Sequence, residues 1–158
     1  MKTSIVYLMV LSLTLVSCKQ SAKESQKATD SHSVQQEIGS DLHLDNDWVN
    51  EIALDNGSKW EANVETTMGV AAMTKLIAEA KTSTKEDYNK LGNGLNDLKN
   101  IIVKECTMTG ASHDNLHVFL HPLIDKIELL QNAATADEGA KIKANITEHL
   151  QGYYSYFD

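Results

Sequence analysis

The sequence predicts an all-α protein, an up-down-up-down four-helix bundle that follows a signal peptide and a disordered tether. Three observations support this prediction. Apolar residues recur at alternating steps of three and four, helix-start motifs precede the apolar segments, and the links between segments are short. Short links favour antiparallel neighbours, which gives the up-and-down order. At 158 residues the chain is long enough for one domain with a substantial core.

The first part of the chain has the pattern of an export signal. A basic residue, Lys2, precedes an apolar run from Ile5 to Val16. That run is too short to span a bilayer comfortably, so residues 1–17 are predicted to be a signal peptide. The next segment, residues 18–41, is polar and without period, which predicts a disordered tether.

The rest of the chain divides into a strap and the bundle. Residues 42–58 carry scattered apolar side chains and an Asp-Asn-Gly turn signal, so we expect an irregular strap or a short helix there. Residues 59–158 are predicted to form the bundle. Its four apolar stripes are Thr66, Val70, Met73, Ile77 and Ala80; Tyr88, Leu91, Leu95, Leu98 and Ile102; Leu116, Leu120, Leu123, Ile127 and Leu130; and Ile142, Ile146 and Tyr153 with Leu150 beside them.

Each helix has a candidate start signal. The motifs Ser58-x-x-Glu61, Ser83-x-x-Glu86 and Thr135-x-x-Glu138 match the capping box, and Ser112 is a plausible N-cap after Gly110. Pro122 interrupts the third helical segment, so a kink or break is expected there.

The residues before the tether resemble the lipobox of bacterial lipoproteins. Leu15, Val16 and Ser17 stand directly before Cys18. This resemblance implies cleavage before Cys18, lipidation of its thiol and anchoring to a membrane of the bacterial cell envelope. Lys19 after the cysteine favours the outer membrane, facing the periplasm or the cell surface. The alternative is an ordinary secretory signal followed by an incidental cysteine.

The charge pattern excludes one class of partner. The chain has a formal net charge of −8, and all its basic residues are Lys. Arg is the preferred residue for bidentate phosphate recognition, so an acidic chain without Arg argues against nucleic-acid binding.

A concentration of metal-ligand side chains marks the stretch from Lys104 to Pro122. In an up-and-down bundle, the end of the second helix and the start of the third meet at one end with the end of the fourth. The pattern therefore predicts a transition-metal site there. Thiolate, thioether and imidazole together favour copper, with zinc as the second choice. The predicted ligands are Cys106, Met108, His113, His117 and His149, with His121, Glu65 and Met68 as possible additional ligands.

A second hypothesis needs no metal. A core histidine is usually satisfied by a hydrogen-bond partner, and a lone buried cysteine behaves as a small hydrophobe. The bundle would then be a structural or partner-binding lipoprotein that contacts another envelope protein through an aromatic patch. That patch would comprise Trp48, Trp60, Tyr153, Tyr154, Tyr156 and Phe157. An enzyme is not expected, because no oxyanion-hole loop or paired-carboxylate motif accompanies the thiol and imidazoles.

Two segments resemble small exported lipoproteins of Bacteroidota-type bacteria. They are ALDNGSKWEANVETTMGVAAM and ECTMTGASHDNLHVFLHPL, and the resemblance covers roughly Ile52 to Leu130. Its most specific part is the Cys-x-Met-x4-His-x3-His segment. This family has no assigned activity, so the resemblance implies fold and location only.

A looser resemblance is to the periplasmic b-type cytochrome four-helix bundles. These bind haem through a Met near the start of the first helix and a His near the end of the fourth. Met68 and His149 stand at comparable places, which implies non-covalent haem binding as a third alternative. Met68 points off the apolar stripe, and the family's His lies nearer the chain end than His149 does.

Overall fold

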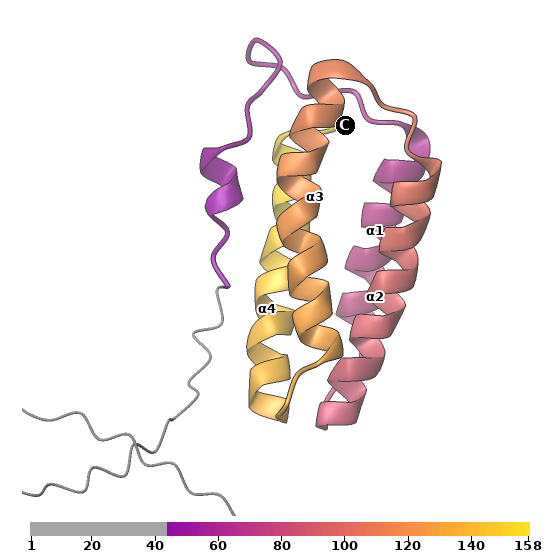
Figure 1. Ribbon diagram of the computed structural model, residues 1–158, viewed down its shortest axis with the longest axis vertical. Coiled ribbons are helices and arrows are strands. Elements are labelled where there is room, and N and C mark those ends of the chain that lie inside the picture. The colour runs from indigo at the N-terminus through magenta and orange to yellow at the C-terminus, as the bar shows by residue number, and fades with distance from the viewer. Residues whose placement is uncertain (1–43) are drawn as a thin grey trace, which may run out of the picture. The chain divides into compact units, whose positions relative to one another are not determined.

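The computed structural model describes residues 44–158, and within them it forms the predicted four-helix bundle. The helices are α1 (Val64–Glu79), α2 (Lys85–Glu105), α3 (Gly110–Gln131) and α4 (Ala136–Gly152), and they alternate in direction (Figure 1). The signal peptide, Cys18 and the tether lie outside the described residues. Among residues 44–158, no helix is both long enough and apolar enough to cross a bilayer.

The predicted apolar stripes form the core. All four helices contribute fully buried side chains, and each predicted stripe supplies several of them. The fully buried apolar residues of the helices include Val70, Met73, Leu95, Ile102, Phe119, Leu123, Leu130, Ile142, Ile146 and Leu150. The sequence period therefore located the buried face of each helix, because burial of that face is what favours the bundle.

The strap before α1 is ordered and packs on the bundle. It contains a short 3-10 helix, η1 (Asp47–Asn50), whose Trp48 is only 4% exposed. The chain ends with a second 3-10 helix, η2 (Tyr153–Ser155), followed by Phe157, which forms an isolated parallel bridge with Trp60.

Two helices begin with a side-chain N-cap at or next to the predicted capping-box motif. At α4, the Thr135 side chain accepts a hydrogen bond of 3.1 Å from the Glu138 backbone N–H, as predicted. At α2 the motif is shifted by one residue, with Thr84 and Asp87 forming a reciprocal capping box. Hydrogen bonds from the Thr84 and Ser83 backbones lower the pKa of Asp87 to about 2.

The other two predicted starts are wrong. Helix α3 begins at Gly110, so Ser112 lies inside its first turn and donates to the Thr109 carbonyl. Helix α1 begins only at Val64, after Asn63. Ser58 instead pairs with Asp55 through two backbone hydrogen bonds of 2.9 Å, closing a tight turn.

Pro122 does not end the third helix. Helix α3 runs continuously from Gly110 to Gln131 with Pro122 inside it, so the predicted break is absent. Buried residues before and after Pro122, such as Phe119 and Ile127, pack in the same core. Tertiary burial on both sides therefore outweighs the hydrogen bond that the proline cannot donate.

Candidate functional site

Helix α3 presents three imidazoles in a line on its outer face, which we call the histidine line (His113, His117 and His121). The ring centroids of His113 and His117 are 4.3 Å apart, and those of His117 and His121 are 4.8 Å apart. His113 is half-buried and the other two are exposed. Residues four apart lie one above the other on a helix, so these rings are neighbours because of their sequence spacing.

The central ring of the histidine line favours its neutral form. Partial burial lowers the pKa of His117, and the neighbouring His113 and His121 lower it further, while Asp114 acts in the opposite direction. A neutral imidazole has a free lone pair for a metal ion. His117 belongs to both neighbouring pairs, so it is the ring on which chelation by either pair depends.

The two sulfur-containing candidates lie on the short link between α2 and α3. Cys106 is the C-cap residue of α2, and Met108 follows it two residues later. Both side chains are half-buried and pack against the core. The link therefore holds a thiol and a thioether at the end of the bundle where α3 and its histidine line begin.

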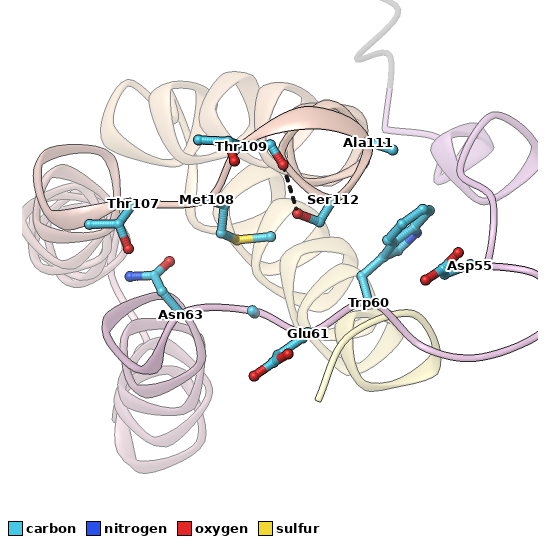
Figure 2. Close-up of a pocket in the computed structure, with 10 residues that line it drawn as sticks. Asp55, Trp60, Glu61, Asn63, Thr107, Met108, Thr109, Ala111 and Ser112 are labelled. Carbon is cyan, nitrogen blue, oxygen red and sulfur yellow. Dashed lines mark hydrogen bonds between the residues drawn. The ribbon is translucent and has the colours of Figure 1, made fainter.

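An open cavity of about 500 Å³ lies at this same end, where the strap passes the α2–α3 link. Figure 2 shows the Met108 thioether pointing into the space between the link and the strap, with Trp60 on the far side. The residues that line the cavity are Asp55, Trp60, Glu61, Ala62, Asn63, Thr107, Met108, Thr109, Ala111 and Ser112.

His149 is separate from these groups, and its predicted place in one ligand cluster needs correction. The side chain is fully buried, as predicted, but both ring nitrogens have partners. Its Nε2 lies 2.8 Å from the Phe119 carbonyl oxygen, and its Nδ1 lies 3.1 Å from Lys126 Nζ. A carbonyl can only accept, so Nε2 carries the proton and Nδ1 accepts from the lysine.

The surroundings of His149 keep it neutral. Burial lowers its pKa to about 3, and the adjacent Lys126 charge contributes to that shift. The ring also stacks on Trp48, with centroids 4.7 Å apart. These contacts satisfy the buried imidazole without a metal, which is the arrangement that the second hypothesis described for a core histidine.

Sequence reasoning missed Lys126, which is only 3% exposed. Besides bonding His149, its ammonium group donates to the Asp45 carbonyl and to Asn46 Oδ1, both at 2.6 Å. Burial lowers the pKa of Lys126, against the opposing charges of Asp45 and Glu148. The sequence spacing does indicate that Lys126 is buried, because it stands three residues after Leu123 and four before Leu130, on the apolar stripe itself.

The two candidates on α1 are exposed. Glu65 accepts a 2.8 Å hydrogen bond from the Asn63 side chain, which lowers its pKa. Met68 is 66% exposed. The structure therefore does not bring exposed Met68 together with buried His149, as axial ligation of one haem would require.

The predicted aromatic contact patch is also largely internal. Trp48, Tyr153 and Phe157 are buried, so they pack within the domain and do not form a surface. Tyr154, at 42% exposure, remains available to solvent.

Within residues 44–158, no three His, Cys, Asp or Glu side chains group closely enough to hold a metal ion. The arrangement that the described chain does provide is the pair of adjacent imidazoles. No protein-family model, curated protein or solved structure matches this chain.

Proposed function

We propose that this protein is a lipid-anchored cell-envelope protein that binds a transition metal, copper or zinc, in a buffering, sensing or delivery role. The observation that carries the proposal is the 4.3 Å separation of the His113 and His117 rings on the exposed face of α3. Two imidazoles one helical turn apart can chelate one ion, and imidazole suits copper and zinc.

The position of the histidine line fits exchange of the ion better than permanent storage. Two imidazoles leave coordination positions that face solvent, where water or a partner protein can bind. Within residues 44–158, neither Cys106 nor any other His, Cys, Asp or Glu side chain joins two of these rings as a third ligand. The net charge of −8 attracts cations to the surface without selecting among them.

Anchoring is part of the proposal and depends on the lipobox resemblance at Cys18. An acylated cysteine would hold the bundle at a membrane surface, and two or more acyl chains make such anchoring stable. A buffering or delivery protein held at a membrane meets ions that cross it.

Calorimetric titration of the full-length chain with Cu(II) and with Zn(II) tests the site, using Cys18→Ser to prevent acylation. His117→Ala removes a ring from both pairs, so we expect affinity to fall by about tenfold or more. His113→Ala and His121→Ala each leave one pair intact, so each should weaken binding less.

Glu128→Ala provides the matched control, because Glu128 is exposed on the same helix and lies beyond the histidine line. Its affinity should equal that of the parent chain. Equal affinities for His117→Ala and Glu128→Ala would contradict the proposed imidazole site.

A further inference from the structure

The cavity at the end of the bundle contains a second kind of metal-binding chemistry, distinct from the histidine line. One wall carries Met108 and the other carries Trp60. A thioether is a soft ligand that selects Cu(I) over harder divalent ions. An indole ring attracts a cation to its face, most strongly where water is displaced.

Trp60 is fixed in place by its own hydrogen bonds. Its indole N–H donates to the Ala53 carbonyl at 2.6 Å. Its backbone N–H donates to Tyr156 at 2.8 Å, and its carbonyl accepts from Asp158 at 3.2 Å. A residue whose backbone is held by two hydrogen bonds and whose ring is held by one loses little further freedom when a ligand binds.

Met108 faces the same space from the opposite side. It lies on the link between two helices that are both packed in the core, and its half-buried side chain contacts that core. In Figure 2 its sulfur points toward the part of the cavity on which Ser112 and Trp60 lie. The thioether therefore lies inside the cavity and remains reachable from solvent.

The charges around the cavity favour a cation. Two carboxylates, Asp55 and Glu61, lie among the lining residues, and the lining has no Lys or His. Carboxylates at the rim raise the local concentration of cations. The hydroxyl groups of Thr107 and Ser112 are hard ligands, so Met108 is the group that selects a soft ion.

We infer that this cavity binds a soft monovalent cation, Cu(I) or Ag(I), between the Met108 thioether and the Trp60 ring. This site goes beyond the proposed function, because it uses different residues and a different ion class from the histidine line. A protein with both sites would distinguish the two oxidation states of copper by binding each at a different place.

Tryptophan fluorescence during titration with Ag(I) tests the inference. The full-length chain should carry Cys18→Ser and Cys106→Ser, so that no thiol competes for silver. We expect saturable quenching with one ion per chain. Trp60→Phe should remove the quenching and leave the emission of Trp48 unchanged, because Trp48 is buried against His149 and does not line the cavity.

Met108→Leu is the decisive variant, because it replaces the thioether with a side chain of similar volume that the fold tolerates. Its silver affinity should fall by about tenfold or more. Met68→Leu changes an exposed methionine outside the cavity lining and should bind as the parent does. Quenching that is absent, or that is equal in Met108→Leu and Met68→Leu, overturns the inference.

His117→Ala separates this site from the histidine line. It should retain silver quenching while its Cu(II) and Zn(II) affinities fall. Met108→Leu should lose silver quenching and keep its Cu(II) and Zn(II) affinities. If His117→Ala abolishes silver quenching as well, one site binds both ions and the separate cavity site is refuted.

Discussion

The two sides of α3 place imidazoles in opposite environments. On the side that faces α4 and the strap, His149 is fully buried, stacked on Trp48 and bonded at both nitrogens. On the outer side, the rings of the histidine line touch one another and two of the three are exposed. A buried imidazole with both nitrogens engaged supports the fold, whereas exposed neighbouring rings are available to a ligand.

The comparison also shows how a buried cation can serve structure. Lys126 has three N–H donors, and the structure supplies three acceptors: a carbonyl, a side-chain amide oxygen and the His149 ring. Two of the acceptors belong to the strap and the third to α4. This single side chain on α3 therefore fastens two other parts of the fold, which compensates for burying its charge.

The largest expected effect is on the buried ring. His149→Ala should lower the free energy of unfolding by about 3–4 kcal/mol, because it leaves a cavity and removes the two buried hydrogen bonds of the ring to Lys126 and to the Phe119 carbonyl. His117→Ala on the exposed side should change it by no more than about 0.5 kcal/mol. Chemical denaturation of the two variants measures both values. If both variants lose a similar amount of unfolding free energy, His149 does not support the fold more than His117 does.

The next effect concerns the attachment of the strap. Lys126→Met should lower the free energy of unfolding by about 2–3 kcal/mol, because the buried His149 Nδ1 and two half-buried oxygens lose their donor. Hydrogen exchange should also speed up in the strap segment 45–53, which Lys126 holds at Asp45 and Asn46.

Lys143→Met is the control for that measurement. Lys143 Nζ also bonds two oxygens, those of Ala80 and Thr82, but it fastens the α1–α2 link and leaves the strap alone. Lys143→Met should lower the free energy of unfolding by about 1 kcal/mol and leave hydrogen exchange in the strap unchanged. Faster strap exchange in Lys143→Met would mean that general loosening, and not loss of the Lys126 contacts, exposes the strap.

The smallest effect is a pH dependence. The pKa of His149 is about 3 in the folded chain, below its ordinary value of 6.5, so the unfolded chain takes up the proton more readily. The stability it contributes is present above pH 6.5 and is lost as the pH falls toward 3. Between pH 6.5 and 5.5 the free energy of unfolding should fall by about 1 kcal/mol.

Denaturation midpoints at closely spaced pH values measure that slope. His149→Gln should flatten it, even though the variant is less stable at every pH. His117→Ala should retain most of the pH slope, because the pKa of His117 is lowered less strongly than that of His149. A slope unchanged in His149→Gln would assign the acid sensitivity to other groups.

The sequence predicted what depends on local pattern. The steps of three and four placed Ile102, Leu116 and Ile146 in the core, where the structure has them. The same steps place His149 and His113 at core positions and His117 and His121 beside the core; the structure buries His149 and leaves His113 half-buried. These positions follow from helical geometry alone, so a single sequence was enough to predict them.

What depends on distant partners could not be predicted. Ser58 and Glu61 match a capping box, yet the residues around them pair with the end of the chain through Trp60 and Ala62. The partner of His149 is a lysine on another helix, and a lysine on an apolar stripe is rarely expected inside. Local motifs describe what a segment can do, and the tertiary contacts decide which possibility is realised.

Asp158 pairs through its backbone with Trp60 and Ala62, two of the residues that line the cavity. The Asp158 backbone N–H donates to the Trp60 carbonyl, and the Asp158 carbonyl accepts from the Ala62 N–H. Opening of the cavity wall that carries Trp60 should break these two hydrogen bonds. The amide resonance of Asp158 should therefore report motion at a cavity whose other wall carries Met108, fifty residues earlier in the chain.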